Sequence, residues 1–112
     1  MEKFESGEII LISFPYSDLT GTKTRPSLVL LDSGDMDVVV ASITSKDTRG
    51  DFDLPLHGWQ QAGLAVPSVV RLNKLFTSSK RSVVRRMGVL IDTDMNRVGE
   101  VLQKYISSFL TA

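Results

Sequence analysis

The chain has 112 residues, the length of one ordinary domain, which is enough to bury a core without disulfides or a structural metal. It contains no cysteine and a single histidine, which excludes a disulfide framework, a thiolate metal site, a cysteine nucleophile and a multi-histidine site. Lysine plus arginine and aspartate plus glutamate number 13 each, so net charge neither indicates nor excludes a polyanionic partner. We expect one domain over residues 1–112, with no metal and no cofactor.

The N-terminal segment MEKFESGEIILISF lacks the basic start of a signal peptide, and its apolar run is too short to span a bilayer. We therefore expect a cytoplasmic protein.

Short apolar runs rich in β-branched residues, separated by turn-forming clusters, predict strands along the first 91 residues. The run VVVASI (38–43) is apolar enough to be buried on both sides. In chain order we expect a strand at 8–14, a polar loop at 15–24, strands at 25–31 and 38–43, a loop at 44–51, a short strand at 52–56, an irregular segment at 57–67, a strand at 68–76, a turn at 77–81, and a strand at 82–90 broken by Gly88.

The C-terminal segment is the one part with a helical period, because apolar residues recur there at steps of three and four: Met95, Val98, Leu102, Tyr105 or Ile106, and Phe109. This spacing predicts a helix over about 92–110.

Three further expectations concern this helix. Asp92 or Thr93 can cap its start, and Asp94 suits the positive end of the helix dipole. Gly99 costs roughly 1 kcal/mol against alanine inside a helix, which indicates close packing at that position.

Many short strands with polar loops and one terminal helix predict a mainly β protein, a small antiparallel barrel over about 7–91 followed by the helix. Such a barrel is filled by its own side chains, so function is expected on its loops or at a subunit interface.

The first candidate functional residue is Arg25, which precedes Pro26 where a polar loop becomes an apolar run. Proline favours an extended backbone at the preceding residue, so Arg25 should enter a strand. Its side chain is either solvated or paired with a nearby acid, or it presents a planar donor fork to an anion. The dipeptide alone does not decide between these interpretations.

The second candidate is ITSK (43–46), where the hydroxyls of Thr44 and Ser45 and the ammonium of Lys46 follow the most apolar strand. Hydroxyls at a strand end commonly form local turns. They can also bind a phosphate or a reacting hydroxyl, with Lys46 adding charge.

The third candidate is a basic segment. Ten of the 13 acidic residues lie in the first 53 positions, whereas residues 54–91 contain no acid and six bases, namely Arg71, Lys74, Lys80, Arg81, Arg85 and Arg86. The segment is either a solvated face or, with Phe76 and Trp59, a surface that holds a phosphate backbone and stacks bases.

His57 has a near-neutral unperturbed pKa, but it lies in an irregular segment without a patterned partner. Paired carboxylates at useful spacing, a P-loop, G-x-G-x-x-G and G-x-S-x-G are all missing from the sequence.

The order of these pieces resembles the MazF/PemK family of toxins from bacterial type II toxin–antitoxin systems, specifically its PemK-like branch. The matching pieces are GEIILISFPYSDLTGTKTRPSLVLL, VVVASITSK and PSVVRLNKLFTSSKRSVVRRMGVL, which cover most of residues 7–90. Gly-Glu-Ile opening one strand and Arg-Pro opening the next are the most characteristic part.

This resemblance implies an SH3-like, plasmid-maintenance-toxin barrel with a C-terminal helix, assembled as a homodimer and inhibited by a cognate antitoxin. It also implies sequence-specific, metal-independent cleavage of single-stranded RNA that leaves a 2′,3′-cyclic phosphate and a 5′-hydroxyl. In that family the arginine of Arg-Pro and the threonine of the TS step are catalytic, and here these are Arg25 and Thr44. We expect the RNA-binding residues to be Thr22, Lys23, Ser45, Lys46, Lys74, Arg81 and Arg85.

Two points qualify the resemblance. Several members carry Glu or Gln in the loop before the arginine, whereas Gly21 is followed here by Thr22, Lys23 and Thr24, so the general base stays unassigned. The barrel also has a relative, CcdB, that poisons gyrase without cutting RNA, and a non-catalytic binding module is therefore the alternative function.

Overall fold

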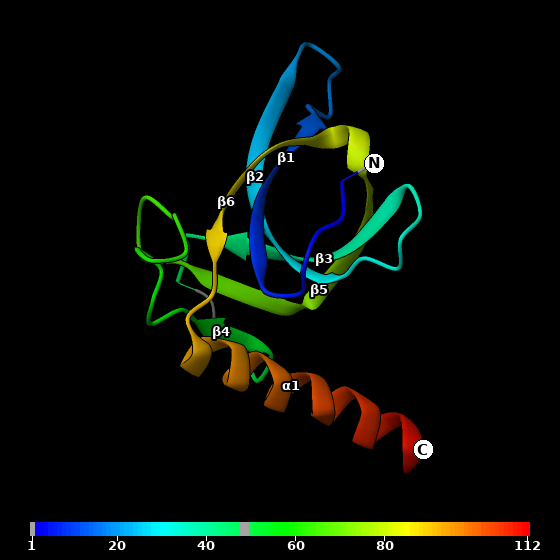
Figure 1. Ribbon diagram of the computed structural model, residues 1–112, viewed down its shortest axis with the longest axis vertical. Helices are drawn as coiled ribbons and strands as arrows, with labels where there is room; N and C mark the ends of the chain where they lie inside the picture. The colour runs from blue at the N-terminus through cyan, green and yellow to red at the C-terminus, as the bar shows by residue number, and fades with distance from the viewer. Residues whose placement is uncertain (1, 48–49) are drawn as a thin grey trace.

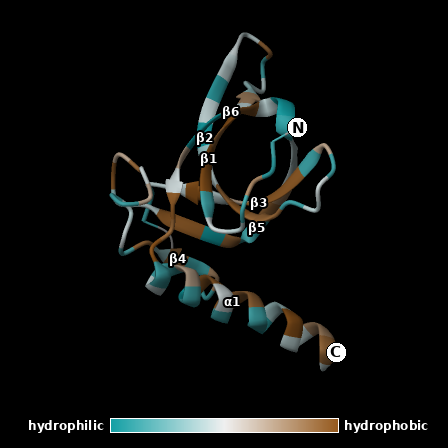
Figure 2. Cartoon of the chain, viewed as in Figure 1, coloured by the Kyte–Doolittle hydropathy of each residue, from teal (hydrophilic) through white to brown (hydrophobic). Residues whose placement is uncertain are grey.

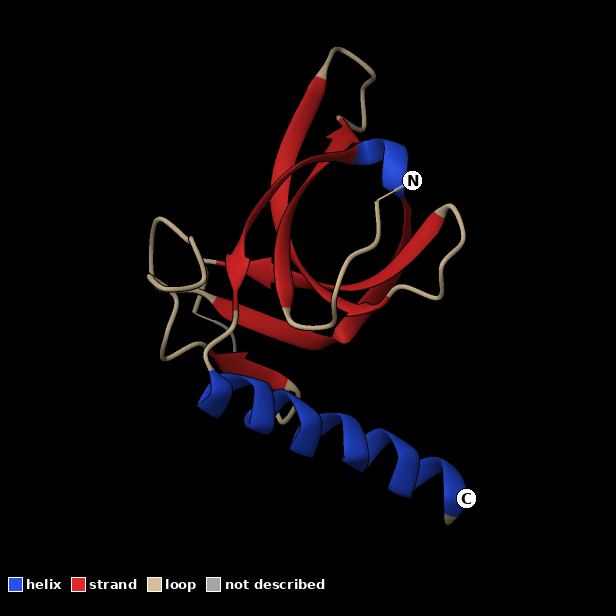
Figure 3. Ribbon diagram, in the orientation of Figure 1, coloured by secondary structure: helices blue, strands red, loops and turns tan. Residues whose placement is uncertain are grey.

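A six-stranded antiparallel sheet and one long helix form the molecule, described here by a computed structural model for residues 2–47 and 50–112. The elements are β1 (Glu8–Pro15), β2 (Thr22–Leu31), β3 (Asp37–Thr44), β4 (Asp53–Pro55), β5 (Val69–Ser79), the 3₁₀ turn η1 (Lys80–Ser82), β6 (Val83–Val89) and α1 (Asp92–Leu110). The strand order is β4-β5-β3-β2-β1-β6, and Figures 1 and 3 show this sheet rolled into a small barrel with α1 outside it. The expected mainly β barrel with a C-terminal helix is confirmed.

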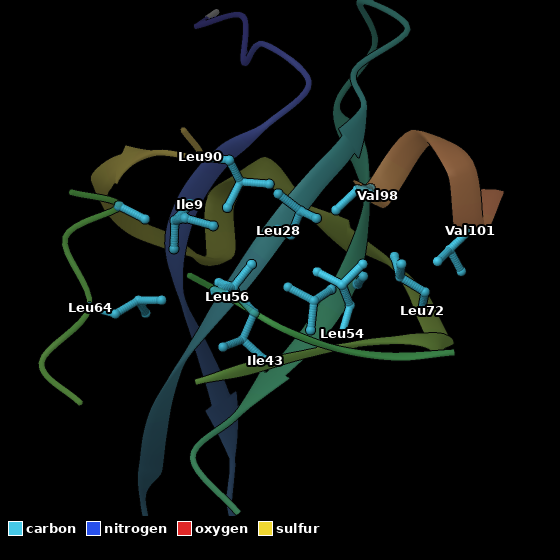
Figure 4. Packing of buried hydrophobic residues seen from close by; sticks show 13 residues of the cluster. Ile9, Leu28, Ile43, Leu54, Leu56, Leu64, Leu72, Leu90, Val98 and Val101 are labelled. Carbon is cyan, nitrogen blue, oxygen red and sulfur yellow. The ribbon is translucent and has the colours of Figure 1, made fainter. Parts of the chain in front are cut away.

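Strand β3, in the middle of the sheet, is buried on both faces. Val38 and Val40 of β3 belong to a cluster on the face turned away from α1, together with Phe4, Ile10, Ile12 and Val29. Ala41 and Ile43 point the other way, into the cluster beneath β4 and α1 shown in Figure 4, which includes Ile9, Leu28, Leu54, Leu56, Leu64, Leu72, Leu90, Val98 and Val101. Burial of β3 on both sides is therefore confirmed, and Figure 2 shows the hydrophobic colouring along β3 and β5.

The β1–β2 connection is shorter than expected. A loop was predicted over 15–24, but Pro15 pairs with Thr22 and Phe14 with Lys23, which leaves residues 16–21 as the loop. Cross-strand hydrogen bonds continue the hairpin through polar residues, and an apolar pattern does not report such bonds. Thr22 and Lys23 thus belong to β2.

The predicted start of the turn at 77–81 is also wrong. Strand β5 continues through Ser79, which pairs with Asp37, and η1 then forms the turn. The Ser79 hydroxyl accepts a hydrogen bond from the Arg81 amide at 3.2 Å. The strand at 52–56 is present as β4, and residues 57–67 are irregular as expected.

The helix matches its predicted span, but its details differ. Ile91 is the N-cap and makes no side-chain cap bond, so the caps expected at Asp92 or Thr93 are wrong. Apart from its chain neighbours and its own helix backbone, none of the described residues comes within 4 Å of the position that a Cβ on Gly99 would occupy, which contradicts the expected close packing. No helix in the described part of the chain is both long and apolar enough to cross a membrane.

Candidate functional site

Arg25 and Thr44 lie at matching positions on neighbouring strands. Ser27 of β2 pairs with Ser42 of β3, and two residues further along each antiparallel strand stand Arg25 and Thr44. Both side chains line one cleft of about 330 Å³, whose other lining residues are Thr24, Pro26, Ile43, Ser45, Lys46, Leu64, Ala65, Val66, Ser68 and Met87. The fold therefore brings four of the predicted site residues together, namely Arg25, Thr44, Ser45 and Lys46.

The Thr44 hydroxyl is oriented by its own turn. Its Oγ1 accepts a hydrogen bond from the Lys46 amide at 3.1 Å, which closes a short turn after β3. A threonine hydroxyl carries one proton and two acceptor lone pairs, so this arrangement leaves its proton free to be donated. The turn-forming interpretation of ITSK is therefore confirmed for Thr44, and anion binding by its hydroxyl stays a prediction.

The Arg25 side chain is exposed, and within residues 2–47 and 50–112 its guanidinium has no hydrogen-bond or ion-pair partner. The lining of the cleft contains no aspartate or glutamate. A solvated arginine and an anion-binding arginine both fit these facts, whereas pairing with a nearby acid is not found among the described residues. The guanidinium keeps all its donors for a ligand.

A second groove meets the cleft at Arg25. It is lined by Phe14, Pro15, Lys23, Arg25, Ser42 and Phe76, again without an acidic residue. The Phe14 and Phe76 rings lie 5.5 Å apart between centroids at 59°. Arg25 therefore stands between an aromatic groove with Lys23 and a hydroxyl-bearing cleft with Lys46.

The far wall of the cleft comes from the segment between β4 and β5, which supplies Leu64, Ala65, Val66 and Ser68. Its position depends on glycines. Gly63 has φ +83°, and a Cβ at that residue would overlap the carbonyl of Met87 in β6. Conversely, a Cβ on Gly88 would come within 2.5 Å of the Ala62 carbonyl oxygen. The two backbones approach so closely that only glycine fits.

The start of the same segment is held by helix α1. The buried Asp94 carboxylate accepts hydrogen bonds from the amides of Gly58 at 2.8 Å and His57 at 3.2 Å. Arg97 bonds to Asp94 at 2.9 Å and to the Pro55 carbonyl at 2.8 Å. The sequence showed Asp94 only as an acid in the first helical turn, so its role in holding this segment was missed.

The basic segment divides into two groups of equal size. Arg71 pairs with Asp53 at 3.3 Å, and the buried Lys80 pairs with Asp32 at 2.9 Å. Arg86 is fixed by four partners: ion pairs to Glu2 at 2.9 Å and Glu8 at 3.0 Å, a hydrogen bond donated to the Lys3 carbonyl at 2.6 Å, and the Phe4 ring, whose centroid lies 4.5 Å away. Lys74, Arg81 and Arg85 are exposed and have no ion-pair partner among the described residues.

The structure does not bring every predicted RNA-binding residue to the cleft. Lys23 reaches the adjoining aromatic groove, whereas Thr22 is exposed at the start of β2 and Lys74 is exposed on β5. Arg81 and Arg85 line a separate groove beside η1 and β6.

The remaining sequence candidates lie elsewhere. His57 is exposed and lines neither the cleft nor the aromatic groove. Trp59 is half-buried against the cluster beneath α1, so its contribution is to packing. In the part of the chain that the structure describes, no three His, Asp or Glu side chains group closely enough to hold a metal ion.

Together these features define a small barrel with a cationic, hydroxyl-bearing and acid-free cleft, suited to binding an anionic ligand. The chain belongs to the PemK-like, MazF-like toxins of type II toxin–antitoxin systems, because the model of that family matches residues 5–106. Members of this family are endoribonuclease toxins.

Solved structures of mycobacterial toxins share this fold. One is an endoribonuclease in complex with its cognate antitoxin from a mycobacterial species, with 14% identity and a TM-score of 0.73 over 94% of this chain and 96% of that one. Another is the Mycobacterium tuberculosis toxin MazF-mt6, with 23% identity and a TM-score of 0.72 over 89% of this chain and 96% of that one. None of the curated proteins matches the chain.

Proposed function

We propose that this protein is a sequence-specific, metal-independent endoribonuclease toxin that cleaves single-stranded RNA and thereby inhibits translation and growth. It acts in the cytoplasm as a homodimer and is inhibited by a cognate antitoxin. One observation carries the proposal: the Arg25 guanidinium and the Thr44 hydroxyl line a single acid-free cleft in a chain of this toxin family.

The reaction that suits these groups is transesterification by the substrate's own 2′-hydroxyl. The 2′-oxygen forms a bond to phosphorus and loses its proton, while the bond from phosphorus to the 5′-oxygen breaks and that oxygen gains a proton. The products are a 2′,3′-cyclic phosphate and a 5′-hydroxyl. DNA lacks the 2′-hydroxyl and is therefore not a substrate.

Arg25 stabilises the transition state. Negative charge grows on the non-bridging oxygens as the 2′-oxygen attacks, and a guanidinium already in place stabilises that charge without reorganisation. Thr44 donates its free proton to the phosphate or orients the attacking hydroxyl, because the hydrogen bond from the Lys46 amide uses one lone pair of its oxygen and not its proton. The described residues that line the cleft include no histidine, aspartate or glutamate, and the proton acceptor is left unassigned.

Lys23, Ser45 and Lys46 bind the nucleotides next to the scissile phosphate. Lys23 lies with Phe14 and Phe76 in the aromatic groove, and Ser45 and Lys46 lie in the cleft. Positive charge tracks a phosphate backbone, and aromatic rings stack bases. Thr22 and Lys74 would contact RNA only beyond these two grooves.

A non-catalytic toxin or binding module is the second candidate. It is favoured because no general base for the 2′-hydroxyl is found among the described residues that line the cleft. The test incubates the purified chain with mixed-sequence single-stranded RNA and with DNA of the same sequence, both in EDTA. We expect the RNA to be cut at a short motif with 5′-hydroxyl ends, the DNA to stay intact, and the activity to disappear in Arg25→Ala. RNA that is bound but never cut would establish the binding module instead.

A further inference from the structure

The groove beside η1 and β6 is the second basic surface of the molecule. We propose that Arg81 and Arg85 in this groove form an outlying subsite for the RNA backbone, which holds phosphates of the strand beyond the cleavage site. This inference rests on the proposed function and adds a binding site outside the cleft of Arg25 and Thr44.

Charge pairing leaves Lys74, Arg81 and Arg85 free, and of these three Arg81 and Arg85 share one groove. Three of the six bases between residues 54 and 91 are neutralised within the molecule, as described above, whereas Arg81 and Arg85 are exposed and unpaired among the described residues. Both line one groove of about 390 Å³. Its single acidic lining residue is Glu2, which is already engaged by Arg86 at 2.9 Å. The free charge of the groove is therefore positive.

The chemistry of the groove fits the phosphate backbone of a nucleic acid better than a nucleobase. A guanidinium offers a rigid pair of donors that matches two phosphate oxygens. The one aromatic residue in the lining, Phe4, is 4% exposed, and Arg86 lies over its ring. No ring in this lining is thus free to stack a base, whereas the cleavage site has the Phe14–Phe76 pair beside it.

Strand β6 connects this groove to the cleft. Arg85 lines the groove and Met87 lines the cleft, and two residues along a strand span about 7 Å. The sheet register gives the same proximity, because Leu11 of β1 pairs with Pro26 of the cleft on one side and with Arg85 on the other. Two strand spacings separate Pro26 from Arg85, or about 10 Å. A nucleic acid strand leaving the cleft across β6 meets Arg85 and then Arg81, which favours RNA over an unrelated acidic ligand.

The experiment measures binding separately from cleavage. The probes are a short RNA containing the cleaved motif and a longer RNA extended on both sides, each with a 2′-deoxynucleotide at the cleaved position. The variants are Arg81→Ala/Arg85→Ala and, as a control that removes an exposed base on helix α1, Lys104→Ala. Dissociation constants are measured over a series of salt concentrations, with thermal unfolding as a check on folding.

We expect the double variant to bind the long RNA more weakly, with the slope of log K against log salt reduced by about 0.7 for each lost phosphate contact, or about 1.4 in total. The loss should be much smaller for the short RNA, and Lys104→Ala should match the wild type. If the double variant is poorly folded, the two single variants replace it, with a slope change of about 0.7 each.

Equal affinities and equal salt slopes of wild type and double variant on the long RNA would overturn the subsite. The subsite would also be overturned if the double variant bound RNA like the wild type but no longer bound poly-glutamate. That result would assign the groove to an acidic protein partner. Failure of the proposed function looks different: the wild type would leave unmodified mixed-sequence RNA uncut. The salt-slope comparison, made with that long mixed-sequence RNA, would still report on the subsite.

Discussion

The carboxylate of Asp94 accepts a hydrogen bond of 2.8 Å from the amide of Gly58, which joins the first turn of helix α1 to the segment that walls the cleft. Asp94 is fully buried, and the His57 amide and Arg97 complete its hydrogen bonds. Six residues after Gly58, the same segment reaches Leu64 in the cleft lining. The helix therefore contributes to the geometry of a site that it does not touch.

Asp94→Asn should destabilise the protein by about 1–3 kcal/mol, because the amide cannot accept all three hydrogen bonds and its NH₂ faces donors. Asp92→Asn is the matched control, since Asp92 is exposed on the same helical turn and removes the same charge. Urea unfolding gives the free energies, and hydrogen exchange at Gly58 reports the segment itself. Equal stability of the two variants would show that the Asp94 bonds do not hold this segment.

Gly63→Ala should be strongly destabilising and should lower RNA cleavage, because the new Cβ overlaps the Met87 carbonyl and displaces the wall of the cleft. Gly34→Ala separates this clash from backbone strain: Gly34 has φ +98°, but beyond its chain neighbours no described residue lies within 4 Å of its Cβ position. We expect Gly34→Ala to lower the free energy of unfolding by about 1 kcal/mol and Gly63→Ala to lower it by clearly more, as measured by urea unfolding. Similar values for both would attribute the effect to φ alone.

The apolar pattern predicted most of the fold because burial dictates it. Each of the main strands contains a short apolar run with β-branched residues, and VVVASI is apolar on both sides because both faces of β3 are covered. The strand ends at Pro15, Thr22 and Ser79 were missed because hydrogen bonding between polar residues extends them, and such pairing leaves no hydrophobic period.

The site was predictable only in part. The Arg-Pro and TS steps indicated Arg25 and Thr44, which the register of β2 and β3 places at corresponding positions. A one-dimensional pattern could not separate the internally paired bases Arg71, Lys80 and Arg86 from the free ones, because their acidic partners are distant in sequence. Lys80 and Asp32, for example, are 48 positions apart.

The Asp32–Lys80 pair makes a prediction about acid stability. Hydrogen bonds from the Phe4 amide and then from Lys80 lower the pKa of Asp32 from 3.8 to about 2. A lowered folded-state pKa means that the ionised carboxylate stabilises the fold above pH 4, and that this contribution is lost as pH falls from about 4 towards 2. The urea midpoint should fall over this range in the wild type.

Asp32→Asn should be less stable at neutral pH, because it leaves the buried Lys80 ammonium without its carboxylate, and its urea midpoint should change less between pH 4 and 2. Asp37→Asn removes an exposed carboxylate instead and should retain the wild-type pH dependence. An unchanged pH dependence in Asp32→Asn would mean that other carboxylates govern acid unfolding.

Arg25→Lys tests whether the guanidinium or only its charge is needed. Lysine keeps the positive charge but not the planar pair of donors, so we expect cleavage to fall by about 100-fold, and by about 1000-fold in Arg25→Ala. Arg25 is exposed, so both variants should unfold like the wild type. Single-turnover cleavage rates measure the effect, and full activity of Arg25→Lys would reduce the role of Arg25 to general electrostatic attraction.

Thr44→Val and Thr44→Ser separate the hydroxyl from the shape of the side chain. Valine preserves the volume but removes both the acceptor for the Lys46 amide and the proton for the phosphate, so we expect the cleavage rate to fall by about 100-fold or more. Serine retains the hydroxyl and should keep most of the activity. Thr77→Val makes the same change at an exposed position on β5 outside the cleft and should leave the rate unaltered. A wild-type rate in Thr44→Val would exclude the hydroxyl from the reaction and return attention to His57.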